Sequence, residues 1–134
     1  MNPVLVDSNV ILDIATNDPR WLAWSRAALA RLAEKTILVV NPVIFAEVST
    51  HYDTFEEVDE ILPPLAFRRE PIPYEAAFLA AKAFAAYRRR GGQRSSPLPD
   101  FFIGAHAAVA RYRLLTRDAA RYRSYFPTVE LIAP

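Results

Sequence analysis

The fold is decided by the N-terminal stretch Pro3-Val4-Leu5-Val6-Asp7-Ser8-Asn9-Val10-Ile11-Leu12. The apolar run at residues 3–6 predicts a short buried strand that ends at Asp7. Ser8 and Asn9 then offer side chains that cap helix N-termini, and an apolar helix follows them directly. The stretch therefore predicts a strand that passes through an acidic residue into a helix.

The same alternation continues along the chain. Further strands are predicted at residues 37–40, 65–72, 114–116 and, at a sheet edge, 129–132. Helices are predicted at residues 20–34, 42–48, 54–62, 73–90 and 100–112. Asp18 and Pro19 are typical of the N-cap and first position of the helix at 20–34, and Thr54 begins a capping box for the helix at 54–62. Alternating strands and helices imply a parallel sheet with right-handed crossovers. We predict an α/β fold of three layers, α/β/α, with a central parallel sheet of four to five strands.

Length and composition fit one globular domain. The chain has 134 residues, of which 52% are hydrophobic and 23% charged, and no repeat or linker divides it. We therefore expect a single domain over residues 1–134. Cysteine is absent, which excludes disulfides and removes the main ligands of structural zinc. The N-terminal apolar run is too short for a signal peptide or a membrane span, so we expect a cytoplasmic protein without membrane contact.

The charge is unevenly distributed along the chain. Residues 1–67 contain 4 basic and 10 acidic residues, and residues 68–134 contain 12 basic and 5 acidic ones, giving −6 and +7 and the overall +1. The arginines gather at residues 88–94 and 111–123. The basic half of the chain, residues 68–134, can present a surface that binds a polyanion. A run of charges is equally typical of solvated helix faces.

Four acids fall where the predicted strands end. Asp7 follows the first strand, Asp118 follows the strand at 114–116, Glu47 lies in the helix after the second strand, and Asp100 opens a helix. Ligands of open α/β sheets bind beyond the carboxyl ends of the strands. Taken singly, Asp7, Asp100 and Asp118 are typical of caps and turns; only Glu47 stands in an otherwise apolar helix. The coincidence of all four favours one site.

Four carboxylates in one cleft repel each other, and a divalent cation bound between them would neutralise this repulsion. Ligands that are all oxygen favour Mg²⁺ or Mn²⁺ over zinc. Phosphoryl transfer is the chemistry that needs such a site.

Four segments together resemble the motifs of PIN-domain nucleases, and most closely those of the VapC-type toxins of toxin–antitoxin pairs. The segments are Val6-Asp7-Ser8-Asn9-Val10-Ile11-Leu12-Asp13, Phe45-Ala46-Glu47-Val48, Leu98-Pro99-Asp100-Phe101-Phe102-Ile103-Gly104-Ala105-His106-Ala107 and Leu115-Thr116-Arg117-Asp118. They occur in the family's order and extend the likeness from Val4 to Leu131. Each motif is short and degenerate, but four in order are fairly specific.

The resemblance implies a Mg²⁺- or Mn²⁺-dependent endoribonuclease in which a metal-activated water attacks the phosphodiester, leaving a 5′-phosphate and a 3′-hydroxyl. Asp7 and Asp100 would be the principal metal ligands, and Glu47 and Asp118 would complete the site. Asn9 and Thr116 match polar positions beside it. The implied partners are RNA, a cognate VapB-type antitoxin that can insert an arginine among the acids, and a second copy in a homodimer.

Several residues remain outside the predicted site. His106 departs from the family pattern and lies about 120° around the helix from Asp100, so we expect a packed or partly exposed histidine and not a metal ligand. Asp13 lies at the same angle from Asp7 and is left out of the site. Trp21 and Trp24 favour core packing over a groove for an antitoxin helix. We expect single-stranded RNA to lie along a basic segment that contains Arg89, Arg90 and Arg94.

Two other functions are compatible with parts of the pattern. One is a non-catalytic PIN-like module that binds RNA or protein, which a missing acid would favour. The other is a phosphatase with Asp7 as nucleophile, but that class generally has a second aspartate where this chain has Asn9.

Overall fold

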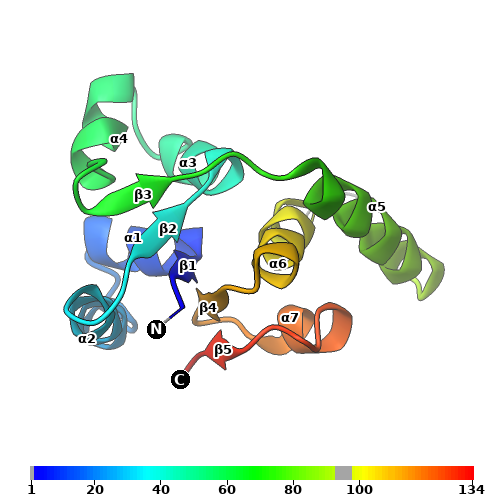
Figure 1. Ribbon diagram of the computed structural model, residues 1–134. Helices are drawn as coiled ribbons and strands as arrows, with labels where there is room; N and C mark the ends of the chain where they lie inside the picture. Colours follow the sequence, from blue (N-terminus) through cyan, green and yellow to red (C-terminus); the bar gives the residue numbers. More distant parts are fainter. Residues whose placement is uncertain (1, 93–97) are drawn as a thin grey trace.

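The computed structural model describes residues 2–92 and 98–134, and at its centre is a five-stranded sheet with parallel pairing throughout (Figure 1). The strands are β1 (Val4–Val6), β2 (Leu38–Val40), β3 (Phe67–Arg69), β4 (Arg113–Leu115) and β5 (Leu131–Ile132). Their order is β3-β2-β1-β4-β5. β1 therefore lies in the middle of the sheet, and the last strand lies at an edge, as predicted.

The described residues also form seven helices. These are α1 (Ser8–Ala15), α2 (Leu22–Ala33), α3 (Pro42–Ser49), α4 (Phe55–Ile61), α5 (Tyr74–Arg89), α6 (Leu98–Ala110) and α7 (Ala120–Tyr125). Figure 1 shows α1 and α2 on one side of the strands and α5 and α6 on the other. The sheet is the middle of three layers, which confirms the predicted α/β/α architecture.

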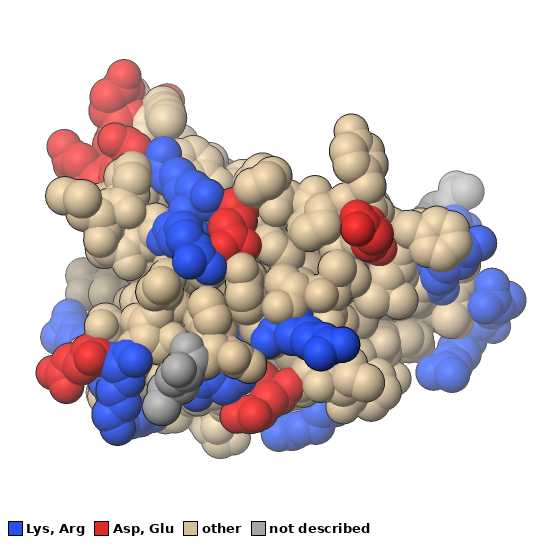
Figure 2. Space-filling model, in the orientation of Figure 1, with Lys and Arg blue, Asp and Glu red and all other residues tan. Residues whose placement is uncertain are grey.

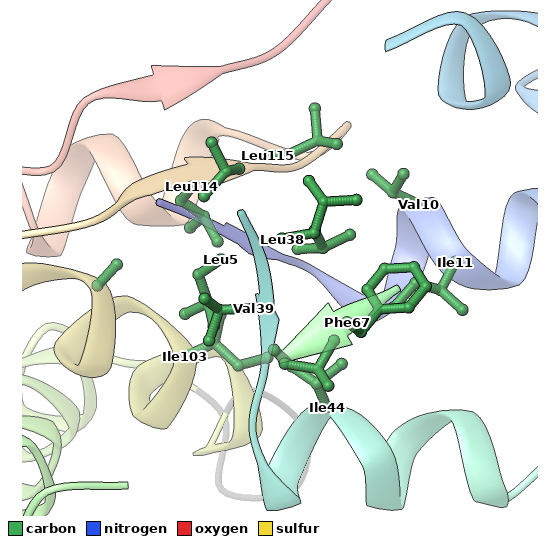
Figure 3. Packing of buried hydrophobic residues seen from close by; sticks show 14 of the residues in the cluster. Leu5, Val10, Ile11, Leu38, Val39, Ile44, Phe67, Ile103, Leu114 and Leu115 are labelled. Carbon is green, nitrogen blue, oxygen red and sulfur yellow. The ribbon is translucent and has the colours of Figure 1, made fainter. Parts of the chain in front are cut away.

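The core lies where the central strands meet the helices on both sides. Figure 3 shows Leu5, Val39 and Leu114 from adjacent strands, with Ile103 of α6 and Val10 of α1 nearby; all five are fully buried. Each such side chain contributes about 1.5–3 kcal/mol by leaving water. This packing fixes the strand ends, and with them the residues that follow each strand.

Two predicted helix starts were wrong. The predicted helix at 20–34 begins at Leu22, because the Asp18 carboxylate accepts hydrogen bonds from the backbone N–H groups of Arg20 (2.8 Å) and Trp21 (2.9 Å) and closes a turn there. The helix predicted from Asp100 already includes Leu98, so Asp100 lies within its first turn. The capping box at Thr54 is confirmed.

The helix α7 was not predicted at all. Its six residues, Ala120–Tyr125, include two arginines and form no apolar stripe in the sequence, but Tyr122 is buried. Over the part of the chain that the structure describes, none of the helices is both long enough and apolar enough to cross a membrane.

Candidate active site

The candidate site lies where the strand order reverses. The chain passes from β1 to β2 and β3 on one side and then returns to β4 on the other side of β1. Asp7 follows β1 directly, and its backbone N–H donates to the carbonyl oxygen of Leu115 at the end of β4 (2.9 Å). Thr116 follows β4. Both residues therefore stand at the topological switch point, where open α/β sheets bind ligands.

Asp7 is the centre of a buried hydrogen-bond cluster. Its side chain is only 3% exposed, and its Oδ2 accepts hydrogen bonds from Thr116 Oγ1 (2.9 Å), Tyr122 OH (2.9 Å) and, more weakly, Asn9 Nδ2 (3.4 Å). Asn9 Nδ2 also lies 3.2 Å from Thr116 Oγ1. The two polar residues predicted to stand beside the site, Asn9 and Thr116, thus contact Asp7 directly.

The Asp7 carboxyl group is strongly perturbed. Burial raises its pKa from the ordinary 3.8 to about 7, and the charges of Asp100 and Glu47 add to the effect. The hydrogen bonds from Thr116 and Tyr122 lower the pKa but do not compensate. Near neutral pH both the protonated and the ionised form of Asp7 are therefore populated. A cation beside the carboxylate would favour the ionised form.

Asp100, from the first turn of α6, lies close to Asp7. The Tyr122 hydroxyl lies 2.9 Å from Asp7 Oδ2 and 3.5 Å from Asp100 Oδ1, so it stands between the two carboxylates. Asp100 Oδ2 forms an ion pair with Arg121 Nη1 at 2.6 Å. Burial raises the pKa of Asp100, and Asp118 adds to the rise, although Arg121 opposes it.

Glu47 reaches the same cluster from α3. Its Oε1 accepts a hydrogen bond from Ser8 Oγ (2.8 Å). Burial raises the pKa of Glu47, with a further contribution from the charge of Asp100, while Ser8 opposes the rise. Ser8 was predicted to cap α1, but α1 has Asp7 at its N-cap without a side-chain cap bond. The Ser8 hydroxyl is used to hold Glu47 instead.

Asp118 stands apart from the other three acids. It is exposed, and its backbone N–H donates to Thr116 Oγ1 (3.1 Å). Its carboxylate acts on the cluster through its charge, which contributes to the raised pKa of Asp100. The structure thus brings Asp7, Glu47 and Asp100 together and leaves Asp118 at the rim.

Arg121 and Tyr122 are site residues that the sequence did not reveal. Both lie on α7, which was not predicted, and both touch the proposed metal ligands. Their only signal in the sequence is that they follow Asp118 by three and four residues, about one helical turn.

The remaining predicted residues lie outside the cluster. Asp13 is buried against Ser25 Oγ (2.7 Å) and Arg117 Nε (2.8 Å), which explains an acid in α1 without a role in the site. His106 is 1% exposed and packed, as expected. Trp24 packs against the core, as predicted. For Trp21 the prediction of core packing was wrong: its ring lies edge-on to Trp24 at 6.4 Å, and the Arg117 guanidinium lies over it at 5.5 Å from the ring centroid.

The predicted RNA-binding arginines are partly described. Arg89 and Arg90 are exposed at the end of α5, and Arg90 lies over the ring of Tyr125 at 5.3 Å. Arg94 lies outside the described residues.

The donor set fits a hard divalent cation. Within residues 2–92 and 98–134, no three Asp, Glu or His side chains are arranged as a complete set of metal ligands. Mg²⁺, however, usually binds through one or two carboxylates and keeps several waters. Asp7 and Asp100, on either side of one hydroxyl, supply two carboxylates, and the charge of Asp100 contributes to the raised pKa of Asp7.

The fold and the site define a class: α/β proteins that carry an acidic cluster at the switch point of a parallel sheet. The family model of the PIN domain matches residues 4–126, so the chain belongs to the PIN domain family. PIN domains are generally nucleases.

Solved structures with the same fold cover nearly the whole chain. One is VapBC2 from Rickettsia felis bound to a DNA fragment from its promoter, with a TM-score of 0.74, 14% identity and 98% of each chain covered. Another is DNA-bound VapBC from Salmonella typhimurium, with a TM-score of 0.71, 14% identity, and 99% of this chain and 98% of that chain covered. A toxin–antitoxin complex from Klebsiella pneumoniae has a TM-score of 0.65, 19% identity and 94% of each chain covered. No curated protein matches the chain in sequence.

Proposed function

We propose that this chain is a metal-dependent endoribonuclease, the toxin of a VapBC-type toxin–antitoxin pair, with residues 1–134 acting as one PIN domain in the cytoplasm. The observation that carries the proposal is the convergence of Asp7, Glu47 and Asp100 from three different elements. Each has a raised pKa, with burial as the main cause and a neighbouring carboxylate as a further one. Such a cluster is costly unless it holds a cation.

In this proposal Asp7 and Asp100 hold Mg²⁺ or Mn²⁺, and Glu47 and Asp118 complete the site directly or through water. A bound ion supplies charge neutralisation at the phosphate and activation of water for phosphodiester hydrolysis. The chain's own residues orient the acids: Thr116 and Tyr122 donate to the same oxygen of Asp7, and Ser8 donates to Glu47.

The proposed substrate is single-stranded RNA. Arg89 and Arg90 are exposed one turn or less beyond Tyr87, and the Tyr87 ring lies 5.5 Å from the guanidinium of Arg121, which in turn contacts Asp100. A basic surface therefore runs from the end of α5 to the acids. Phosphate contacts of this kind, to which we add Arg94, position the strand without reading its sequence.

The proposed protein partners are a VapB-type antitoxin and a second copy of the chain. The similarity in fold to complexes named VapBC or toxin–antitoxin supports the first. The molecule also offers a binding surface: an apolar hollow of about 270 Å³ between α1, α2, α4 and β3. It is lined by Ile11, Ile14, Ala15, Leu29, Ile61 and Phe67. In this proposal an apolar antitoxin segment covers the four of these side chains that are half-buried, Ile14, Ala15, Leu29 and Ile61.

The test is cleavage of labelled single-stranded RNA by the purified chain with Mg²⁺ or Mn²⁺. We expect cleavage that EDTA abolishes and that Asp7→Asn and Asp100→Asn each reduce by more than about 100-fold, because each removes a charge that would hold the ion. Asp53→Asn is the matched control, since Asp53 is exposed on a loop before α4. Circular dichroism checks that all variants fold.

Other outcomes would contradict the proposal. RNA binding without cleavage in any metal would support a non-catalytic PIN-like module. Hydrolysis of small phosphomonoesters with RNA left intact would support a phosphatase.

A further inference from the structure

Asp100 has an intramolecular counter-ion. Arg121 Nη1 lies 2.6 Å from Asp100 Oδ2, with side-chain exposures of 33% and 30%. The Arg121 guanidinium also lies over the ring of Tyr87, 5.5 Å from its centroid. The other oxygen of Asp100 faces the Tyr122 hydroxyl at 3.5 Å. Both carboxylate oxygens are thus in contact with groups from α7.

This ion pair opposes metal binding at the same carboxylate. Among the described residues, Arg121 is the only cation in an ion pair with any of the four proposed site acids. A short bond to Oδ2 occupies a lone pair that a metal would use, and two cations beside one carboxylate repel each other. Arginine stays protonated at every physiological pH, so the guanidinium charge is present whenever Asp100 is ionised and able to bind a metal.

We propose that Arg121 is an exchangeable counter-ion of Asp100, which holds the carboxylate when no divalent ion is bound and must leave it before an ion can bind. The inference rests on the proposed function, because it assumes that Asp100 is a metal ligand. The partial exposure of Arg121 and its contact with Tyr87 give the displaced side chain a place outside the cluster. The ion pair between Arg121 and Asp100 therefore lowers the affinity for the metal, because this pair has to break before the metal can bind to Asp100.

The first test is calorimetric titration of the full-length chain with Mn²⁺ alone, at pH 8 so that the acids are ionised. Arg121→Gln should bind Mn²⁺ about two- to fivefold more tightly than Arg123→Gln, because the cost of breaking a partly exposed ion pair is removed. Arg123 is the matched control, since it is exposed on the same helix and its replacement removes the same charge. Arg121→Lys, which keeps the charge but loses the planar fork, should give an intermediate affinity.

The second test is thermal unfolding without metal and with saturating Mn²⁺. Arg121→Gln should have a lower Tm than the unmutated chain without metal, because Asp100 loses its partner, and the difference should shrink when Mn²⁺ takes the place of the guanidinium. If Arg121→Gln does not fold, Arg121→Lys carries both tests.

The outcomes separate this inference from the proposed function. If the unmutated chain binds Mn²⁺ and Arg121→Gln binds it no more tightly than Arg123→Gln, the exchange is overturned and the nuclease proposal stands. If neither the unmutated chain nor any variant binds Mn²⁺, both are overturned.

Discussion

At the scale of single residues, the buried Asp7 lowers the free energy of unfolding when it is ionised. It is almost completely buried, and three donors on one of its oxygens still leave its pKa near 7. A carboxyl group whose pKa is higher in the folded than in the unfolded chain lowers stability once the pH is high enough to ionise it. A cation bound to the ionised Asp7 would offset this loss of stability.

The first prediction follows from this pKa. Between pH 4 and pH 7 the unfolded chain loses the Asp7 proton and the folded chain keeps it, so folding stability falls as the pH rises through this window and is flat above it. Asp7→Asn has no proton to lose. Without metal, it should therefore be more stable than the unmutated chain by about 2–4 kcal/mol at pH 8, and nearly equal to it at pH 4.

Urea unfolding in EDTA at the two pH values measures this difference. A stability gain of the same size at pH 4 and pH 8 would mean that the Asp7 carboxyl is not the titrating group. Asp53→Asn serves again as the control, because it makes the same substitution at an exposed position.

At the scale of elements, a buried polar link joins α3, which carries Glu47, to α6, which carries Asp100. Asn41 Oδ1 accepts from the backbone N–H of Ile44 (2.9 Å) and caps α3, and Asn41 Nδ2 lies 3.0 Å from His106 Nδ1. Because the Asn41 amide nitrogen can only donate, His106 Nδ1 is the acceptor and its proton is on Nε2, which faces Glu70 Oε1 at 3.7 Å. Burial lowers the pKa of His106, which favours this neutral form.

We therefore expect Asn41→Ala to cost more than the loss of an ordinary cap. It removes the cap of α3 and leaves the His106 ring nitrogen without a donor, for a total of about 2–3 kcal/mol. Thr54→Ala, in the exposed capping box of α4, should cost only about 1 kcal/mol. Urea unfolding at pH 7 compares the two variants, and equal losses would show that the link to His106 contributes nothing.

The same scale explains what the sequence could and could not predict. The five strands were predictable, because buried strands are continuous apolar runs. The meeting of Asp7 and Thr116 was predictable as well, because the carboxyl ends of parallel strands meet at one edge, but the position of Asp118 at the rim was not. The helix α7 was not, because six residues are too few for a periodicity, and its fold depends on the burial of Tyr122 beside Asp7. The contacts of Arg121 with Asp100 and of Ser8 with Glu47 join residues that are far apart in the sequence. No local sequence pattern therefore predicts them.

At the scale of the whole molecule, the uneven charge of the sequence becomes an uneven surface. Figure 2 shows acidic atoms gathered over α4 and basic atoms at the far end of α5. The acids of α4 are Glu56, Glu57, Asp59 and Glu60, and the last residues of α5 and its C-cap are Arg88, Arg89 and Arg90. RNA has to approach an acidic site, and it can do so more easily from the basic end.

The last prediction tests this path through the salt dependence of RNA binding. Each phosphate contact on a single strand contributes about 0.7 to the slope of log affinity against log salt. Replacing Arg89 and Arg90 together by Gln should therefore lower the slope by about 1.4, measured by fluorescence anisotropy with a short single-stranded RNA in EDTA, where a metal-dependent enzyme cannot cleave it. Replacing the exposed pair Arg26 and Arg31 of α2 removes the same charge on the other side of the sheet and should leave the slope unchanged. If both pairs lower it equally, the protein attracts RNA through its net charge alone, and the strand does not follow the end of α5 to the site.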